Sequence, residues 1–133
     1  MIINAAAIAI GAALGAWLRW LFAIIFNPIF PTMPMGTLLA NLTGGLLIGL
    51  IIGVTRDYPL FTATFYLAFV TGFLGSLTTF STFSGETALL IMQRQWGWVA
   101  ASCLAHLGGS LLMTISGIFI STTLLSPNTY VQN

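Results

Sequence analysis

Four long apolar segments, separated by short polar connections, run through the chain at residues 3–26, 36–54, 60–92 and 98–124. A helix needs about 20 predominantly apolar residues to cross the hydrocarbon core of a bilayer, and each segment approaches or exceeds that length. The pattern therefore predicts an all-α membrane protein in which residues 1–133 form one domain of four transmembrane helices.

The third segment is longer than one span requires, and its middle has the wrong composition for a helix. Gly72 and Gly75 disfavour helix, and the Ser and Thr hydroxyls of residues 76–82 compete for backbone hydrogen bonds. We therefore expect a broken third helix, with two helical halves joined by an unwound break near residues 75–80. At the middle of a bilayer, irregular backbone persists only where it is buried in protein, lines a wet cavity or holds an ion. This stretch is accordingly the leading candidate for a functional site.

Charged residues are scarce: 58% of the chain is hydrophobic and only 4% is charged, whereas a soluble domain carries about 25% charged residues. The sequence has no lysine, and its acids and bases are Arg19, Arg56, Arg94, Asp57 and Glu86. The three arginines are too few to form a nucleic-acid-binding surface or a polybasic lipid-binding patch, so we expect no nucleic acid among the partners. The apolar N-terminus lacks the basic region of a signal peptide, so we interpret it as a retained first span.

Two polar residues stand out in the first half of the chain. Arg19 is flanked by Trp17 and Trp20, so it either anchors the helix at the membrane interface or attracts anions into a vestibule. Asn41 lies one helical turn from Thr37, on the same face. A carboxamide at lipid depth must bond to a neighbouring helix or line a polar path, and both interpretations of Asn41 remain open.

The second half of the third segment carries one acid and two aromatic residues. Glu86 is a functional candidate because carboxylates are rare inside membranes, but its neighbours Ser81 and Thr82 also allow a buried structural role. Phe80 and Phe83 share one helical face. They are either core residues or present their positively charged ring edges to an anion.

The fourth segment carries a polar stripe at successive i+4 positions, formed by Ser102, His106, Ser110 and Thr114. A single Ser or Thr in a helix can bond back to its own i−4 carbonyl, but four polar residues on one face predict a track that faces protein or water. His106 has no second His, Cys or Asp at metal-ligand spacing, so a buried imidazole is favoured over a metal ligand.

Residues 75–83, Gly-Ser-Leu-Thr-Thr-Phe-Ser-Thr-Phe, resemble the signature of the Fluc (CrcB) fluoride channel family. Residues 36–44 and the pattern of Gly11, Gly15 and Arg19 resemble that family too, and the likeness covers all four segments in order. The chain departs from the family at Trp20, where Tyr is usual, and at His106, where an aromatic such as Tyr is expected.

The resemblance implies a fluoride-selective channel that lets fluoride leave the cytoplasm passively, in the inner membrane of a bacterium. It implies an antiparallel, dual-topology homodimer with a structural sodium ion at the dimer axis, held by the backbone carbonyls of Gly75 and Thr78. The fluoride pore would be lined by Asn41, Phe80, Phe83, His106, Ser110 and Thr114. Arg19 would lie in the vestibule, and supporting polar groups would come from Ser81, Thr82 and Glu86.

Physical chemistry allows this interpretation. Burying a bare anion costs tens of kcal/mol, and neutral donors and ring edges offer replacement interactions without a fixed charge that would hold the ion. A proton-coupled exporter of the small multidrug-resistance type has a similar size, but this chain has no acid in its first segment, so Glu86 would have to serve. An intramembrane serine protease would need Ser76 or Ser81 with His106, and no nucleophile motif supports it.

Overall fold

The computed structural model describes residues 1–57 and 61–125, and within them all regular structure is helical. Four helices are long and apolar enough to cross a membrane, at Ile2–Ile29, Met35–Thr55, Ala63–Met92 and Trp96–Leu124. The predicted all-α membrane fold with four transmembrane segments is therefore confirmed.

The chain begins with α1 (Ile2–Phe26), which continues into a short 3-10 turn, η1 (Asn27–Ile29), before α2 (Met35–Asp57). The third span consists of α3 (Ala63–Tyr66), a π-helical segment η2 (Leu67–Leu74), α4 (Gly75–Leu77) and α5 (Phe80–Met92). The fourth consists of α6 (Trp96–Cys103), a second π-helical segment η3 (Leu104–Gly108) and α7 (Gly109–Leu125).

Several element boundaries differ from the sequence prediction by a few residues; the fourth span, for example, begins at Trp96 rather than at residue 98. The helix α2 continues to Asp57 rather than ending at residue 54, because the first residue after it that disrupts a helix is Pro59. Residues 58–60, where the third span was expected to begin, lie outside the described residues. In the third span the non-helical residues are Thr78 and Thr79 alone, whereas the sequence predicted unwinding over residues 75–80.

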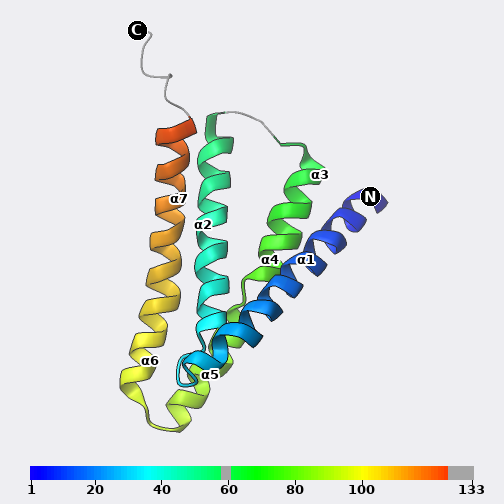
Figure 1. Ribbon diagram of the computed structural model, residues 1–133. Coiled ribbons are helices and arrows are strands. Elements are labelled where there is room, and N and C mark those ends of the chain that lie inside the picture. The colour runs from blue at the N-terminus through cyan, green and yellow to red at the C-terminus, as the bar shows by residue number, and fades with distance from the viewer. Residues whose placement is uncertain (58–60, 126–133) are drawn as a thin grey trace.

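Glycines bring the helices into close contact in two places. Helix α2 lies alongside α7 (Figure 1), and a methyl group at Gly49 would collide with the Thr114 carbonyl. Helix α1 crosses the third span, where methyl groups at Gly11 and Gly15 would collide with backbone carbonyls of that span. Side chains larger than hydrogen would therefore force both helix pairs apart.

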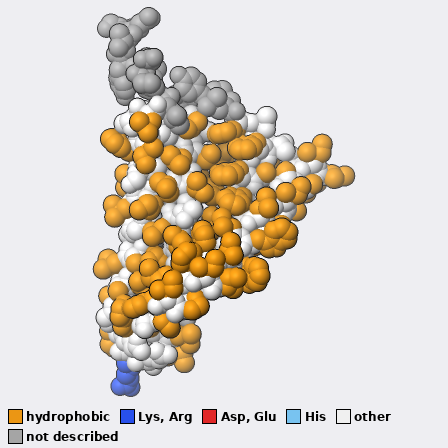
Figure 2. Space-filling model, viewed as in Figure 1, with side chains coloured by type: hydrophobic (Ala, Val, Ile, Leu, Met, Phe, Trp, Pro, Cys, Tyr) orange, Lys and Arg blue, Asp and Glu red, His pale blue; other side chains and the backbone are white. Residues whose placement is uncertain are grey.

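A small core and a large apolar surface complete the fold. The buried cluster of Ala40, Leu74 and Leu77 lies where α2 meets the third span. The face seen in Figure 2 is covered mainly by hydrophobic side chains, and large apolar residues such as Trp17 and Leu111 are exposed. Exposing so much apolar surface to water is unfavourable, so this surface faces lipid or another protein.

Candidate functional site

The helical ladder of the third span is interrupted at Thr78 and Thr79, which we call the extended pair. Thr78 has ψ 151°, and Thr79 has φ −147° and ψ 111°, so both are in the β region. Thr79 then caps α5, because its Oγ1 accepts a hydrogen bond from the Thr82 amide at 3.2 Å. The extended pair therefore ends one helix and begins the next within two residues.

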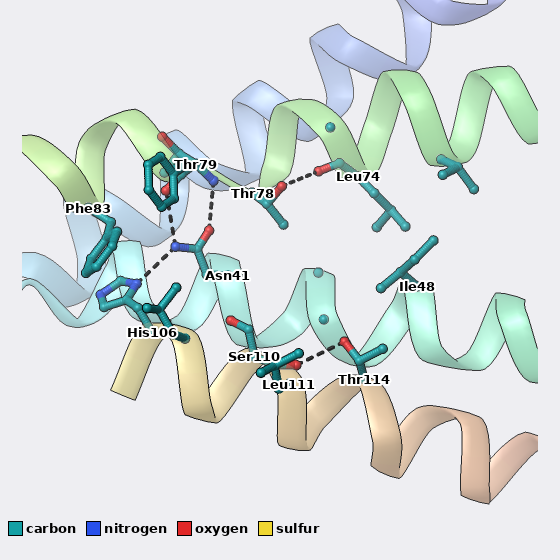
Figure 3. A pocket seen from close by; sticks show the side chains of 16 residues that line it. Asn41, Ile48, Leu74, Thr78, Thr79, Phe83, His106, Ser110, Leu111 and Thr114 are labelled. Carbon is teal, nitrogen blue, oxygen red and sulfur yellow. Dashed lines mark hydrogen bonds between the residues drawn. The ribbon is translucent and has the colours of Figure 1, made fainter. Parts of the chain in front are cut away.

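Asn41 on α2 holds the extended pair in place. The Thr79 amide donates to Asn41 Oδ1 at 2.7 Å, and Asn41 Nδ2 donates back to the Thr79 carbonyl at 3.2 Å. Asn41 Nδ2 also lies 3.0 Å from Nδ1 of His106. One carboxamide thus accepts from the Thr79 amide, which the interruption removed from the helical ladder, donates to the Thr79 carbonyl, and joins three spans (Figure 3).

The Asn41 bond to the Thr79 amide and the Thr79 cap on α5 together leave two backbone carbonyls without their helical donors. In an uninterrupted helix, the Thr79 amide would bond to the Gly75 carbonyl, and the Thr82 amide to the Thr78 carbonyl. Here the first amide donates to Asn41 and the second to the Thr79 side chain. The carbonyls of Gly75 and Thr78 are therefore released from the helical ladder.

A cleft of about 590 Å³ opens beside the extended pair. Its walls come from α2, the third span and the fourth span, and the predicted pore residues among them are Asn41, Phe80, Phe83, His106, Ser110 and Thr114. Gly75 and Thr78 also line it. The structure thus brings these residues, drawn from three separate segments, to one cavity (Figure 3).

The polar stripe of the fourth span does not act as one unit. Thr114 Oγ1 donates to its own i−4 carbonyl at 2.9 Å, as a Thr in a helix commonly does. Ser102 lies outside the cleft, is buried, and has its hydroxyl 3.4 Å from that of Thr87. Only His106, Ser110 and Thr114 of the stripe reach the cleft wall.

The two phenylalanines occupy different environments. Phe83 is buried and stacks on His106, with ring centroids 4.7 Å apart and planes inclined by 28°. Phe80 meets Phe83 edge to face at 5.6 Å but is 71% exposed. Phe83 is therefore part of the packed wall, whereas Phe80 projects from the surface of the single chain.

Arg19 lines a smaller pocket of about 250 Å³ next to the extended pair. Thr37, Thr79 and Thr82 line the same pocket, and the neighbouring Trp20 contributes to its wall. Ser81 is exposed, and its hydroxyl lies 3.3 Å from that of Thr79.

Glu86 is joined to α2 by a hydrogen bond from Thr37 Oγ1 to its Oε1, at 2.7 Å. Its other oxygen, Oε2, is buried and has no hydrogen-bond partner among the described residues. Glu86 also lines a third pocket, of about 320 Å³, together with Gln93 and Gln95 near the turn between α5 and α6.

Comparison with known proteins identifies the family to which this chain belongs. The model of the family described as CrcB-like protein, Camphor Resistance (CrcB), matches residues 6–118, which is most of the chain. The chain belongs to the CrcB family. The CrcB chain is also similar to proteins named "Fluoride-specific ion channel FluC" from several bacteria.

The similarity to these relatives is extensive. The protein from Nitrosospira multiformis is 54% identical over 112 residues, which cover 84% of the CrcB chain and 88% of the relative. The protein from Cupriavidus taiwanensis is 50% identical over 113 residues, covering 85% and 90%. The protein from Aromatoleum aromaticum is 50% identical over 111 residues, covering 84% and 85%. The CrcB chain is therefore a multi-pass integral membrane protein of a family of ion channels.

Sequence reasoning missed parts of this CrcB site. Thr79 was not singled out, although it caps α5 and binds Asn41 through both backbone groups. Its place in the hydroxyl-rich stretch was the available signal. The bond between Thr37 and Glu86 joins positions 49 residues apart, and no local pattern predicts it. The π-helical turn that contains His106 has no recognised sequence signal either, although such turns are often found at functional sites.

Proposed function

We propose that this CrcB chain forms a fluoride-selective channel that lets fluoride leave the cytoplasm passively across the inner membrane of a bacterium. The observation that carries the proposal is the match to proteins named fluoride-specific ion channels, over 84% of the chain at 54% identity. The proposal assigns no enzymatic activity.

The cleft beside the extended pair suits an anion that must be held briefly and then released. Fluoride is small and strongly hydrated, so polar groups must replace its water. The cleft offers the hydroxyl of Ser110, the imidazole of His106 and the ring edges of Phe80 and Phe83. Lys and Arg are absent from its lining within the described residues, so no fixed positive charge would trap the ion there.

The functional unit in this proposal is an antiparallel homodimer. The cleft is open in the single chain, and Phe80 projects beside it, 71% exposed. Gly75 is exposed as well, and a methyl group there would meet only the Val70 carbonyl, at 3.8 Å. Such a glycine has no role in packing its own chain, so a close approach by a second copy gives it one. A second chain would also cover apolar surface that is otherwise left to lipid.

A sodium ion at the dimer axis fits the backbone at the extended pair. Unwound carbonyls at the end of a helix are the usual protein ligands of sodium inside membranes. The carbonyls of Gly75 and Thr78, released from the ladder by Asn41 and Thr79, are of this kind. Bound there, a cation would supply positive charge between the two copies and stabilise the dimer.

The remaining polar residues have supporting roles in this proposal. Arg19 would attract fluoride into the vestibule, since its pocket adjoins Thr79 and Thr82 at the start of α5. Ser81, beside Thr79, and Glu86, near the turn between α5 and α6, would add polar groups at the two ends of this stretch of α5.

Fluoride efflux from liposomes that contain only this protein tests the function. Fluoride should leave rapidly under its own gradient, chloride should not, and the flux should carry net charge without proton exchange. Efflux that required a proton gradient would instead favour the exporter related to small multidrug-resistance proteins. The serine protease hypothesis has no support here, because in the described part of the chain the His106 ring nitrogens have Asn41 as their only hydrogen-bond partner.

A further inference from the structure

The bond to the Thr79 amide determines how the Asn41 carboxamide is oriented. A backbone N–H can only donate, so the Asn41 atom 2.7 Å from Thr79 N must be the carbonyl oxygen. The other arm is therefore the NH2 group. Its two hydrogens are directed to the Thr79 carbonyl at 3.2 Å and to Nδ1 of His106 at 3.0 Å. Both hydrogens of Asn41 are thus engaged within the protein.

This orientation selects one form of the His106 imidazole. An amide NH2 group has no lone pair to offer, so Nδ1 of His106 must accept and cannot carry a proton. A neutral imidazole then carries its single proton on Nε2. The doubly protonated ring is incompatible with the same contact, because it would place two N–H groups against each other.

The resulting Nε2–H group is a buried donor: the His106 side chain lines the cleft, and its Nε2 is enclosed within the single chain. His106 is 3% exposed, and its Nε2 has no hydrogen-bond partner within residues 1–57 and 61–125. The ring is stacked on Phe83 at 4.7 Å, which restricts its rotation. Figure 3 shows His106 and Phe83 on one side of Asn41, and Ser110 and Thr114 on the other. Because leaving a buried donor unpaired is costly, such a group calls for a ligand.

We propose that Thr79 and Asn41 hold His106 as the neutral Nε2–H tautomer, and that this N–H donates a hydrogen bond to fluoride in the conduction path. The inference rests on the proposed function as a fluoride channel. It assigns Asn41 as a positioning residue, since its own hydrogens are occupied, and His106 as the group that contacts the anion.

The tautomer can be observed directly, because His106 is the single histidine of the chain. Selective 15N labelling of histidine, followed by solid-state NMR of the protein in lipid bilayers, should show a protonated Nε2 and an unprotonated Nδ1. Asn41→Asp replaces the NH2 group with an acceptor, so the proton should appear on Nδ1 in that variant. A protonated Nδ1 in the unmodified protein would overturn the proposal.

Fluoride binding is tested on the same sample. The Nε2–H resonance should shift when sodium fluoride is added and should not respond to sodium chloride. In liposomes, His106→Phe keeps an aromatic ring against Phe83 but lacks the donor, so fluoride flux should fall at least tenfold. His106→Gln, whose terminal amide restores a donor, should retain more flux than His106→Phe.

The outcomes separate this inference from the proposed function. An Nε2–H resonance that ignores fluoride, in protein that conducts fluoride, would refute the role of His106 and leave the channel assignment intact. A resonance that reports a hydrogen bond to the partner subunit, unchanged by fluoride, would likewise refute the role of His106 and leave the channel assignment intact. Absence of fluoride flux from liposomes with the unmodified protein would refute the channel assignment itself. If His106→Phe fails to assemble, the fluoride titration of the unmodified protein still decides the question.

Discussion

Substitution of Gly75 by alanine separates the requirements of the single chain from those of the dimer. Within one chain, the new methyl group would have the Val70 carbonyl at 3.8 Å as its nearest neighbour, which is an ordinary van der Waals contact. Alanine is favoured over glycine in a helix by up to about 1 kcal/mol. If the chain acted alone, Gly75→Ala would therefore leave its fold unchanged or slightly more stable.

The dimer should respond in the opposite direction. An extra methyl group in a well-packed interface costs about 1–3 kcal/mol, and a symmetric dimer contains the substitution twice, which gives about 2–6 kcal/mol. Since each 1.4 kcal/mol is a factor of ten, the dissociation constant should rise roughly 30-fold or more. Fluoride flux at low protein density should fall with the dimer fraction.

The assay is single-molecule photobleaching of labelled protein in lipid bilayers, measured over a range of protein densities. Gly97→Ala is the matched control, because an added methyl group at Gly97 would likewise meet no close neighbour, and Gly97 lies in the first turn of α6, away from the extended pair. Gly97→Ala should dimerise like the unmodified protein. If Gly75→Ala also does so and conducts normally, the reasoning that places Gly75 at a dimer interface is wrong.

Four further predictions follow from the site. Phe83→Ile should lower fluoride flux in liposomes at least tenfold, because it removes the ring edge and the stack on His106 while keeping most apolar volume; flux equal to the unmodified protein would contradict this. Thr37→Val should cost about 1–3 kcal/mol, measured by thermal unfolding in detergent, because Glu86 Oε1 loses its donor; Thr37→Ser should restore most of it. Replacing sodium by a large organic cation should weaken the dimer and cut flux, and an unchanged flux would count against the proposed cation. Two or three lysines added near residues 55–59 should force one orientation and abolish activity in the protein expressed alone, because the connections on the two sides otherwise carry one arginine each, Arg56 after the second segment and Arg94 after the third. A partner chain biased toward the opposite orientation should rescue the activity.

Local composition was enough to predict the class of this protein. Hydropathy is a property of each segment by itself, so four apolar stretches with almost no charge identified four membrane-spanning helices. The glycines and hydroxyl residues of the third span predicted an interruption at residues 75–80, and the extended pair lies within that stretch. Helical periodicity also grouped Thr37 with Asn41 and aligned the polar stripe of the fourth span, because residues four apart share a face.

Hydrogen-bond partners were decided only by the tertiary structure. Sequence left open whether Asn41 joins helices or lines a path, and the fold brings it to the Thr79 backbone, to His106 and to the cleft wall at once. The partner of Glu86, 49 residues away at Thr37, was equally undetermined. Periodicity states which face of a helix is polar, but a hydrogen bond is made only within about 3 Å. Which groups come that close depends on how the four spans pack, and local sequence does not specify that packing.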